Sequence, residues 1–488
     1  MFKITTFTPE LLPCWWWGKD EYDDYDNKLK ELHYDDSFVH LCLHTKYSIS
    51  NSICNIKDVI ATAKKYDMGS IAITDFCTMK GVYEFCKEAK NAGIKPIIGC
   101  EFYVIDDNIA SSGCGNNAEM ISLILLAQCI GDYRAILRLI TDSDVKYGCD
   151  SHYITVADLQ SLYNNSLIGI AGFMLDNVSS DKIGNCLDLQ KNIISKCSKE
   201  IQGAFFMGIR NFNPAFESIV MKKVYSIFDI DDIPFVRVND IRFIRSEDYK
   251  AYAIANAAFK NKSINNLCLV PNKENYFKTS QEIKEQNEYH CAYKNAWAIA
   301  YQCDFDLKDE LFMNVKHKPI LIKIKPDASY WKGKITWTDN NESLFDMIIE
   351  FAKKRFKCQY AAKIIAYEDY NSLDSIMRIA ATMNISSDTL SQLKAMLPNK
   401  PCVSIDDVLK QSDELKMFYR QDHEIKHLMD TTKIIQDLPW KFTTHKSAFV
   451  ISAEPINIYF PMRYYEGEPM IEWPISALED IGIPTADM

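Results

Sequence analysis

Three apolar stretches decide the fold of this chain: FVHLCLHTKYS from Phe38, SIAITDF from Ser70 and IKPIIGCEFYV from Ile94. Short apolar runs of this kind are typical of buried parallel strands. The segments between them, residues 57–66 and 82–92, read as helices, as crossover connections do. The pattern predicts an α/β fold of the β/α-barrel type, in which the chemistry gathers where the strands end.

Side chains that can hold a metal lie at or near the ends of these strands. Cys42 and His44 are two residues apart on one strand, so both point to the same side. Thiolate and imidazole are both good zinc ligands. Asp75 and Glu101 stand at the ends of the next two strands. The sequence therefore predicts a candidate metal site at one end of the barrel.

The same segments resemble the PHP (polymerase and histidinol phosphatase) domain at the start of the bacterial DNA polymerase III alpha subunit. The resemblance continues in the order of that family through LILLAQCIGDYRAILRLIT from Leu123, SLIGIAGF from Ser166 and IPFVRVNDIRFIRSEDYKAY from Ile233. It implies a distorted PHP-type β/α barrel over residues 38–306, preceded by an aromatic and acidic extension over residues 1–37.

The second half of the chain also resembles that family. KCQYAAKIIAYEDYNSLDSI from Lys357 is similar to the entry into its thumb, and HKSAFVISAEPINIYFPMRYYEGEPMIEWPISALEDIGI from His445 is similar to its palm strands. We therefore expect a shortened palm remnant or linker over residues 307–342, a helical thumb-like domain over 343–440, and palm-like strands over 441–488.

The resemblance also assigns the barrel site. His44, Asp75, Glu101 and Asp240 match the family pattern, whereas Cys42 would be a histidine in metal-binding members. The other departures are Asn51, Phe76, Ser122 and Arg242, which stand where the family has aspartate or histidine. A phenylalanine ring cannot coordinate a metal, and Arg242 would repel zinc while pairing with Asp75 or Glu101. These changes favour a salt-bridged remnant over a multinuclear site; weak binding of zinc or manganese on Cys42, His44 and one carboxylate stays open.

Template-directed polymerases hold two divalent metals with paired carboxylates. The family carries two of them on a P-D-x-D-x-D strand, where this chain reads GKITWTDN from Gly333, with Ile335 and Trp337 in place of the aspartates and only Asp339 nearby. The third carboxylate is matched by Asp487, one residue before the chain stops and before any fingers subdomain. No glycine lies between Gly208 and Gly333 or between Gly333 and Gly467, which excludes a glycine-rich phosphate cradle there. We expect that the chain alone does not extend DNA, and that magnesium binds only if a partner completes the site.

Bulk properties set further limits. A chain of 488 residues is long enough for two to four domains. Its net charge of -11 argues against a surface that grips nucleic acid everywhere, but leaves room for a local basic cluster that contacts DNA. That cluster comprises Lys353, Lys354, Arg355 and Lys357. The 16 cysteines form no C-x-x-C pair and read as reduced core residues, and the absence of a signal peptide or a long apolar run predicts a cytoplasmic protein without membrane contact.

Three functions follow from these observations. The first is a replication protein of the polymerase III alpha type, working as a non-catalytic subunit or as one fragment of a split polymerase. Its partners would be a second polymerase fragment, the proofreading exonuclease or other replisome subunits, with DNA as a further ligand. The second is a PHP-type metal-dependent phosphoesterase or 3′–5′ exonuclease, and the third is a decoy that captures replisome proteins.

Overall fold

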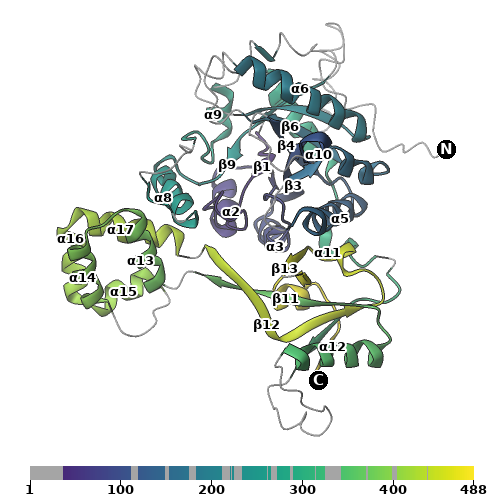
Figure 1. Cartoon of the computed structure of the whole chain (residues 1–488). Helices are drawn as coiled ribbons and strands as arrows, with labels where there is room; N and C mark the ends of the chain where they lie inside the picture. Colours follow the sequence, from purple (N-terminus) through teal and green to yellow (C-terminus); the bar gives the residue numbers. More distant parts are fainter. Residues whose placement is uncertain are drawn as a thin grey trace.

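The computed structural model describes residues 37–110, 119–148, 153–174, 183–210, 220, 223–224, 233–260, 262–264, 272–285, 290–313, 315–324, 342–369, 372–397, 404–436, 438–465 and 467–487. These residues form a barrel-like region, a second sheet and a helical region, and the second sheet in Figure 1 combines green and yellow strands because the helical region lies between them in sequence. None of the helices in these ranges combines the length and the apolar character needed to cross a membrane.

The barrel is built from a curled sheet with the strand order β2-β3-β4-β6-β7-β8. Its strands are β2 (Ser70–Ile73), β3 (Lys95–Ile105), β4 (Met120–Leu126), β6 (Ile168–Phe173), β7 (Phe205–Arg210) and β8 (Phe235–Val238), with β5 (Tyr153–Thr155) paired to β3. Strand β1 (Cys42–Leu43) pairs in parallel with β9 (Asp240–Ile241), and His40 forms a bridge with Ile71 of β2. These last pairings connect the two ends of the sheet, so the strand ends converge on one site.

The predicted α/β barrel fold is confirmed, with one departure from the parallel pattern. Strand β4 runs antiparallel to both of its neighbours, β3 and β6, whereas β2–β3, β6–β7 and β7–β8 are parallel. An antiparallel strand needs no crossover helix. Here β4 follows β3 without a long intervening helix; the described residues between them hold only α4 (Asp107–Ala110).

Helices pack around this sheet. They are α2 (Ile56–Lys65), α3 (Val82–Ala92), α5 (Ile130–Tyr147), α6 (Ile183–Glu200), α8 (Tyr249–Phe259), α9 (Ser280–Glu285), α10 (His290–Gln302) and α11 (Leu307–Glu310). The Asn55 side chain caps the start of α2 by accepting a hydrogen bond from the Lys57 amide. Helix α3 ends at Gly93, whose φ of 77° lies in the left-handed region that favours glycine. The helices predicted at residues 57–66 and 82–92 therefore form.

A second sheet of six strands follows, with the order β13-β14-β11-β12-β10-β15. The strands are β10 (Ile320–Lys323), β11 (Tyr360–Asp369), β12 (Pro439–Ser452), β13 (Met462–Tyr465), β14 (Glu468–Ile471) and β15 (Thr485–Asp487). Helix α12 (Glu342–Phe356) covers one face by packing Ile348 and Ala352 against Ile322 and Phe449. The opposite face packs with α18 (Ile475–Asp480) and the barrel.

A helical region is inserted between β11 and β12. It consists of α13 (Ser372–Thr382), α14 (Ser387–Met396), α15 (Ile405–Gln411), α16 (Asp413–Gln421) and α17 (His423–Ile435). Serine or aspartate side chains cap the last four helices: Ser386, Ser404, Ser412 and Asp422. The region packs on α8 of the barrel through a shared apolar core. Helix α12 and strand β11, which we expected in the helical domain of residues 343–440, pack instead with the second sheet.

Candidate metal site in the barrel

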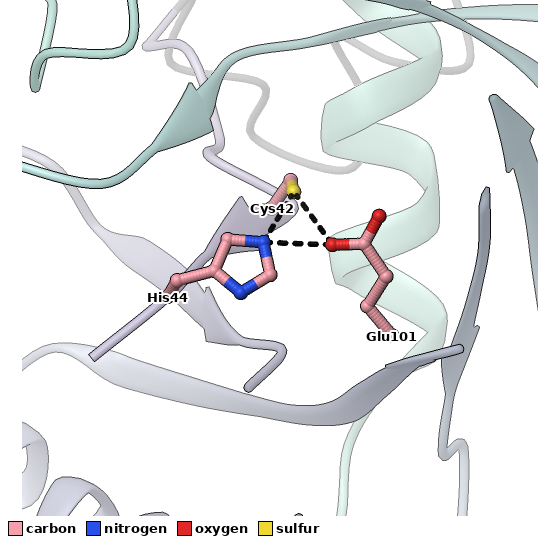
Figure 2. A group of neighbouring side chains, drawn as sticks. All are labelled: Cys42, His44 and Glu101. Atoms are coloured by element: carbon pink, nitrogen blue, oxygen red, sulfur yellow. Dashed lines mark hydrogen bonds and ion pairs between the residues drawn. The ribbon is translucent and has the colours of Figure 1, made fainter. Parts of the chain in front are cut away.

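Three side chains with metal-binding atoms meet inside the barrel. Cys42 and His44 come from β1 and the residue just after it, and Glu101 comes from the middle of β3; all three are buried. Figure 2 shows the three groups pointing toward one another. His44 Nε2 lies 2.7 Å from Glu101 Oε2, and Cys42 Sγ lies 3.7 Å from His44 Nε2 and 3.9 Å from Glu101 Oε2. Each residue thus offers one ligand atom within 4.8 Å of the others.

Asp240, from β9, borders this group. Its Oδ1 lies 3.4 Å from His44 Nε2 and 3.9 Å from Cys42 Sγ. The parallel pairing of β1 with β9 sets this position, because Cys42 and Asp240 are register partners. Four of the five predicted site residues therefore converge.

Asp75, the fifth, lies apart from the ligand atoms. Its carboxylate accepts hydrogen bonds from the Thr45 amide (2.6 Å), the Thr45 hydroxyl (2.6 Å) and the Ser48 hydroxyl (2.7 Å). Ser48 Oγ in turn lies 3.2 Å from His44 Nδ1, so Asp75 acts on the site through Ser48. Burial raises the pKa of Asp75, and these hydrogen bonds oppose the rise. Its role in this geometry is to hold the loop after β1 and the ring of His44.

Two arginines occupy the same site. Arg210, at the end of β7, contacts Glu101 and Ser122 through Nη2, and its Nη1 lies 3.3 Å from Asp240 Oδ2. Arg242 Nε donates to Asp240 at 3.0 and 3.1 Å. We had expected Arg242 to pair with Asp75 or Glu101; that expectation is wrong, because Arg242 directly follows β9 and pairs with Asp240, two residues before it.

The arginines fix the charge state of the carboxylates. Burial alone would raise both pKa values, but Arg210 and then His44 hold the pKa of Glu101 well below its usual range. Arg242 and then Arg210 lower the pKa of Asp240 in the same way. Burial, reinforced by Glu101 and Asp240, raises the pKa of the Cys42 thiol well above its usual value. Two carboxylates thus face two guanidinium groups and a neutral thiol.

This arrangement fits a bound metal poorly. Sulfur, nitrogen and oxygen donors suit zinc, but the 2.7 Å between His44 Nε2 and Glu101 Oε2 is a direct hydrogen-bond distance. Glu101 and Asp240 already form ion pairs with Arg210 and Arg242, and these arginines also repel a metal cation.

Sequence reasoning missed Arg210, Gly172 and the role of Ser122. Arg210 ends the apolar run FFMGIR, where an arginine after a buried strand was the only available signal. Ser122 and Gly172 are register partners on β4 and β6, and both are small residues beside the guanidinium. Their proximity to Arg210 depends on pairings between strands far apart in sequence, which one sequence does not show.

The remaining predicted residues lie elsewhere. Asp487 is exposed on the edge strand β15, in register with Lys323 of β10. Asp339 lies outside the described residues. The basic cluster occupies the last turn of α12 and the turn after it: Lys353 pairs with Glu350 at 2.7 Å, and Lys354, Arg355 and Lys357 are exposed.

Comparisons with known proteins agree with this architecture. Residues 40–209 match the PHP domain family model, and residues 339–488 match the model of the bacterial DNA polymerase III alpha NTPase domain. The DNA polymerase III subunit alpha of Borreliella burgdorferi is 23% identical, with 92% of this chain and 48% of that protein covered. The corresponding subunit of Bacillus subtilis is 20% identical over the same shares of both chains.

Among solved structures, an amidohydrolase from Chromobacterium violaceum has a TM-score of 0.27 and 14% identity, covering 42% of this chain and 88% of that one, too low a similarity to support an assignment. The chain spans about half the length of the curated relatives it matches. It carries a PHP domain followed by a polymerase III alpha segment, and it resembles the bacterial DNA polymerase III alpha subunit.

Proposed function

We propose that this protein acts in DNA replication as a relative of the polymerase III alpha subunit, in which the PHP barrel is a structural platform rather than a hydrolase. The observation that carries the proposal is a single apolar core shared by the barrel and the polymerase-like sheet. Buried residues of α3 and α5 belong to this core together with those of β14 and α18. A barrel that merely preceded the sheet along the chain would not share its core.

Specific contacts fasten the two regions together. Trp473, fully buried after β14, lies with its ring centroid 5.4 Å from that of Tyr83 of α3 at a tilt of 51°, and its Nε1 donates to the Met79 carbonyl at 3.3 Å. Glu472, also buried, accepts from the Thr78 hydroxyl at 2.8 Å and from Arg463 at 3.2 Å. Buried polar groups that are paired in this way fix one arrangement of two packed surfaces.

The proposal includes that the chain does not polymerise by itself. Two-metal catalysis needs a cluster of carboxylates. Asp487, which the resemblance aligns with the third carboxylate, stands on an edge strand opposite a lysine, and Ile335 and Trp337 replace the aspartate pair in the sequence. Magnesium would enter only with a partner chain that supplies the missing groups. A second polymerase fragment, a proofreading exonuclease or other replisome subunits are the partners we propose.

A hydrolytic function has one observation in its favour, the group formed by Cys42, His44 and Glu101. Zinc or manganese on this group would give a PHP-type phosphoesterase. The buried arginines, which pair with Glu101 and Asp240, argue for the platform instead. We therefore place hydrolysis second.

DNA contact is proposed at the end of α12. Lys354, Arg355 and Lys357 are exposed within four residues, and none of the ion pairs among the described residues involves them. Phe351, which is 52% exposed, precedes Arg355 by one helical turn and adds an aromatic surface. Cations beside an exposed ring are suited to a nucleic acid strand.

Two experiments test the proposed function. Purified protein is incubated with primed template, nucleotides and magnesium or manganese, and no extension is expected; extension abolished by Asp487→Ala or Asp339→Ala would show an intrinsic polymerase. Affinity capture from the host then separates the partner hypotheses. Recovery of a second polymerase fragment supports a split enzyme, whereas recovery of intact replisome subunits supports a scaffold or a decoy.

A further inference from the structure

We propose that Arg210 takes the place of a divalent cation in the barrel site, in a space that the small residues Gly172 and Ser122 leave open. This inference goes beyond the platform function, because it concerns how the barrel site is neutralised. A platform would remain a platform if Arg210 had another role.

The contacts of Arg210 resemble those of a bridging ion. Its guanidinium reaches Glu101 from β3 and Asp240 from β9, two carboxylates on different strands of the barrel. Its side chain is only 11% exposed, so the pairs form away from solvent. A planar guanidinium has five donors in fixed directions, so Nη2 of Arg210 can bind Glu101 while Nη1 points to Asp240.

Two small residues leave the space that the Arg210 guanidinium occupies. A β-carbon on Gly172 would lie 2.8 Å from Arg210 Nε and 3.4 Å from its Cζ. Ser122, the register partner of Gly172, accepts a hydrogen bond from Arg210 and donates one to Glu101. The PHP pattern places a histidine at Ser122, and that larger ring would compete with the guanidinium for the same space. The small residues and the arginine therefore depend on one another.

The substitution has a chemical consequence. A guanidinium carries no vacant coordination position, and it cannot lower the pKa of a bound water as a metal does. Arg242, bound to Asp240, balances the second carboxylate. The site then works as an internal ion-pair lock that joins β1, β3, β7 and β9.

Metal analysis with variants tests this proposal. Wild-type protein and Arg210→Met are loaded with zinc, dialysed against metal-free buffer, and assayed for bound metal and for thermal unfolding with and without zinc. The wild type should retain substoichiometric zinc and show no thermal shift. Arg210→Met should hold about one zinc, with affinity raised at least about 100-fold, because a guanidinium in contact with Glu101 opposes a dication on that carboxylate by that order or more. The gain should vanish in Arg210→Met/Cys42→Ser.

Arg245→Met is the matched control, since it deletes an arginine that is 60% exposed and paired outside the site. Gly172→Ala keeps every charge but displaces the Arg210 guanidinium from this space. This variant should unfold at a lower temperature than the wild type, and zinc should restore its unfolding temperature. Stoichiometric zinc in the wild type would overturn the proposal, as would a folded Arg210→Met that takes up none. If Arg210→Met does not fold, Gly172→Ala decides the question. Unchanged stability and no response to zinc in Gly172→Ala would refute the proposal that Gly172 makes room for Arg210.

Discussion

Replacing Trp473 with alanine should destabilise the barrel and the second sheet together. A tryptophan side chain buries about 150–250 Å², and at about 25 cal/mol per Å² its removal costs about 4–6 kcal/mol. Trp473 is fully buried between the rings of Tyr83 and Phe460, at 5.4 and 5.6 Å, so the neighbours cannot collapse fully into the gap. The carbonyl of Met79 also loses its donor, which adds about 1 kcal/mol. We expect a total loss of about 5–7 kcal/mol in the free energy of unfolding.

Urea titration followed by far-ultraviolet circular dichroism measures this loss. Trp473→Phe is the matched control, because it keeps an aromatic ring in the core but has no N–H for Met79; it should cost about 1–3 kcal/mol. The platform argument requires that barrel and sheet signals shift together. A loss below about 1.5 kcal/mol in Trp473→Ala, or a shift confined to the sheet, would refute the reasoning.

Three further predictions follow from charges. Burial lowers the pKa of His40 to about 3, so between about pH 6.5 and 3 the unfolded chain binds a proton that the folded chain does not. The free energy of unfolding therefore falls as pH drops through this window, by up to about 1.4 kcal/mol per pH unit. His40→Gln should flatten this slope when urea midpoints are measured as a function of pH. Hydrogen bonds from Lys87 and Tyr83 lower the pKa of Asp480 from 3.8 to about 2. Its contribution to the free energy of unfolding, at most about 1 kcal/mol at this partly exposed position, is present above about pH 4 and lost as pH falls toward 2. Asp480→Asn should therefore differ from the wild type in stability at pH 5 but converge with it near pH 2. Changing the three exposed cations of α12 to alanine should lower the salt slope of single-stranded DNA binding by about 2; the control removes equal charge from α2, and equal losses in both would place the contact elsewhere. The α12 set is Lys354, Arg355 and Lys357, and the α2 set is Lys57, Lys64 and Lys65.

The sequence predicted best the parts of the fold that depend on local patterns. The apolar runs at Ser70 and Ile94 became β2 and β3, and residues 82–92 became α3 with the predicted bounds. The first run was less regular: only Cys42–Leu43 form a strand, since β9 offers just two partner residues. The antiparallel course of β4 could not be predicted, because strand direction depends on pairing and a buried run looks the same in either direction.

Most residues that gather in the candidate site were predicted, but the charge balance among them was not. Cys42 and His44 share a face because strand side chains alternate, which spacing alone reveals. Arg210 lies 109 residues after Glu101, and no local pattern connects them. The partner of Arg242 was mistaken for a different reason, because the local acceptor Asp240, two residues earlier, was overlooked.

The boundary between the helical region and the second sheet illustrates a further limit. Helix α12 is amphipathic like the helices after it, so its pattern does not say which surface it covers. Its apolar residues pack on Ile322 and Phe449, contacts that require β10 and β12 to be assembled first.

The insertion of the helical region has a consequence for how such proteins can change. Its chain leaves β11 at Asp369 and returns to β12 at Pro439, and these two residues are cross-strand partners. Entry and exit points lie next to each other, as they do in a β-hairpin (Figure 1). An insertion of this kind can be shortened, exchanged or replaced by a tight turn without altering the register between β11 and β12. Relatives can therefore carry a different helical region on the same pair of strands.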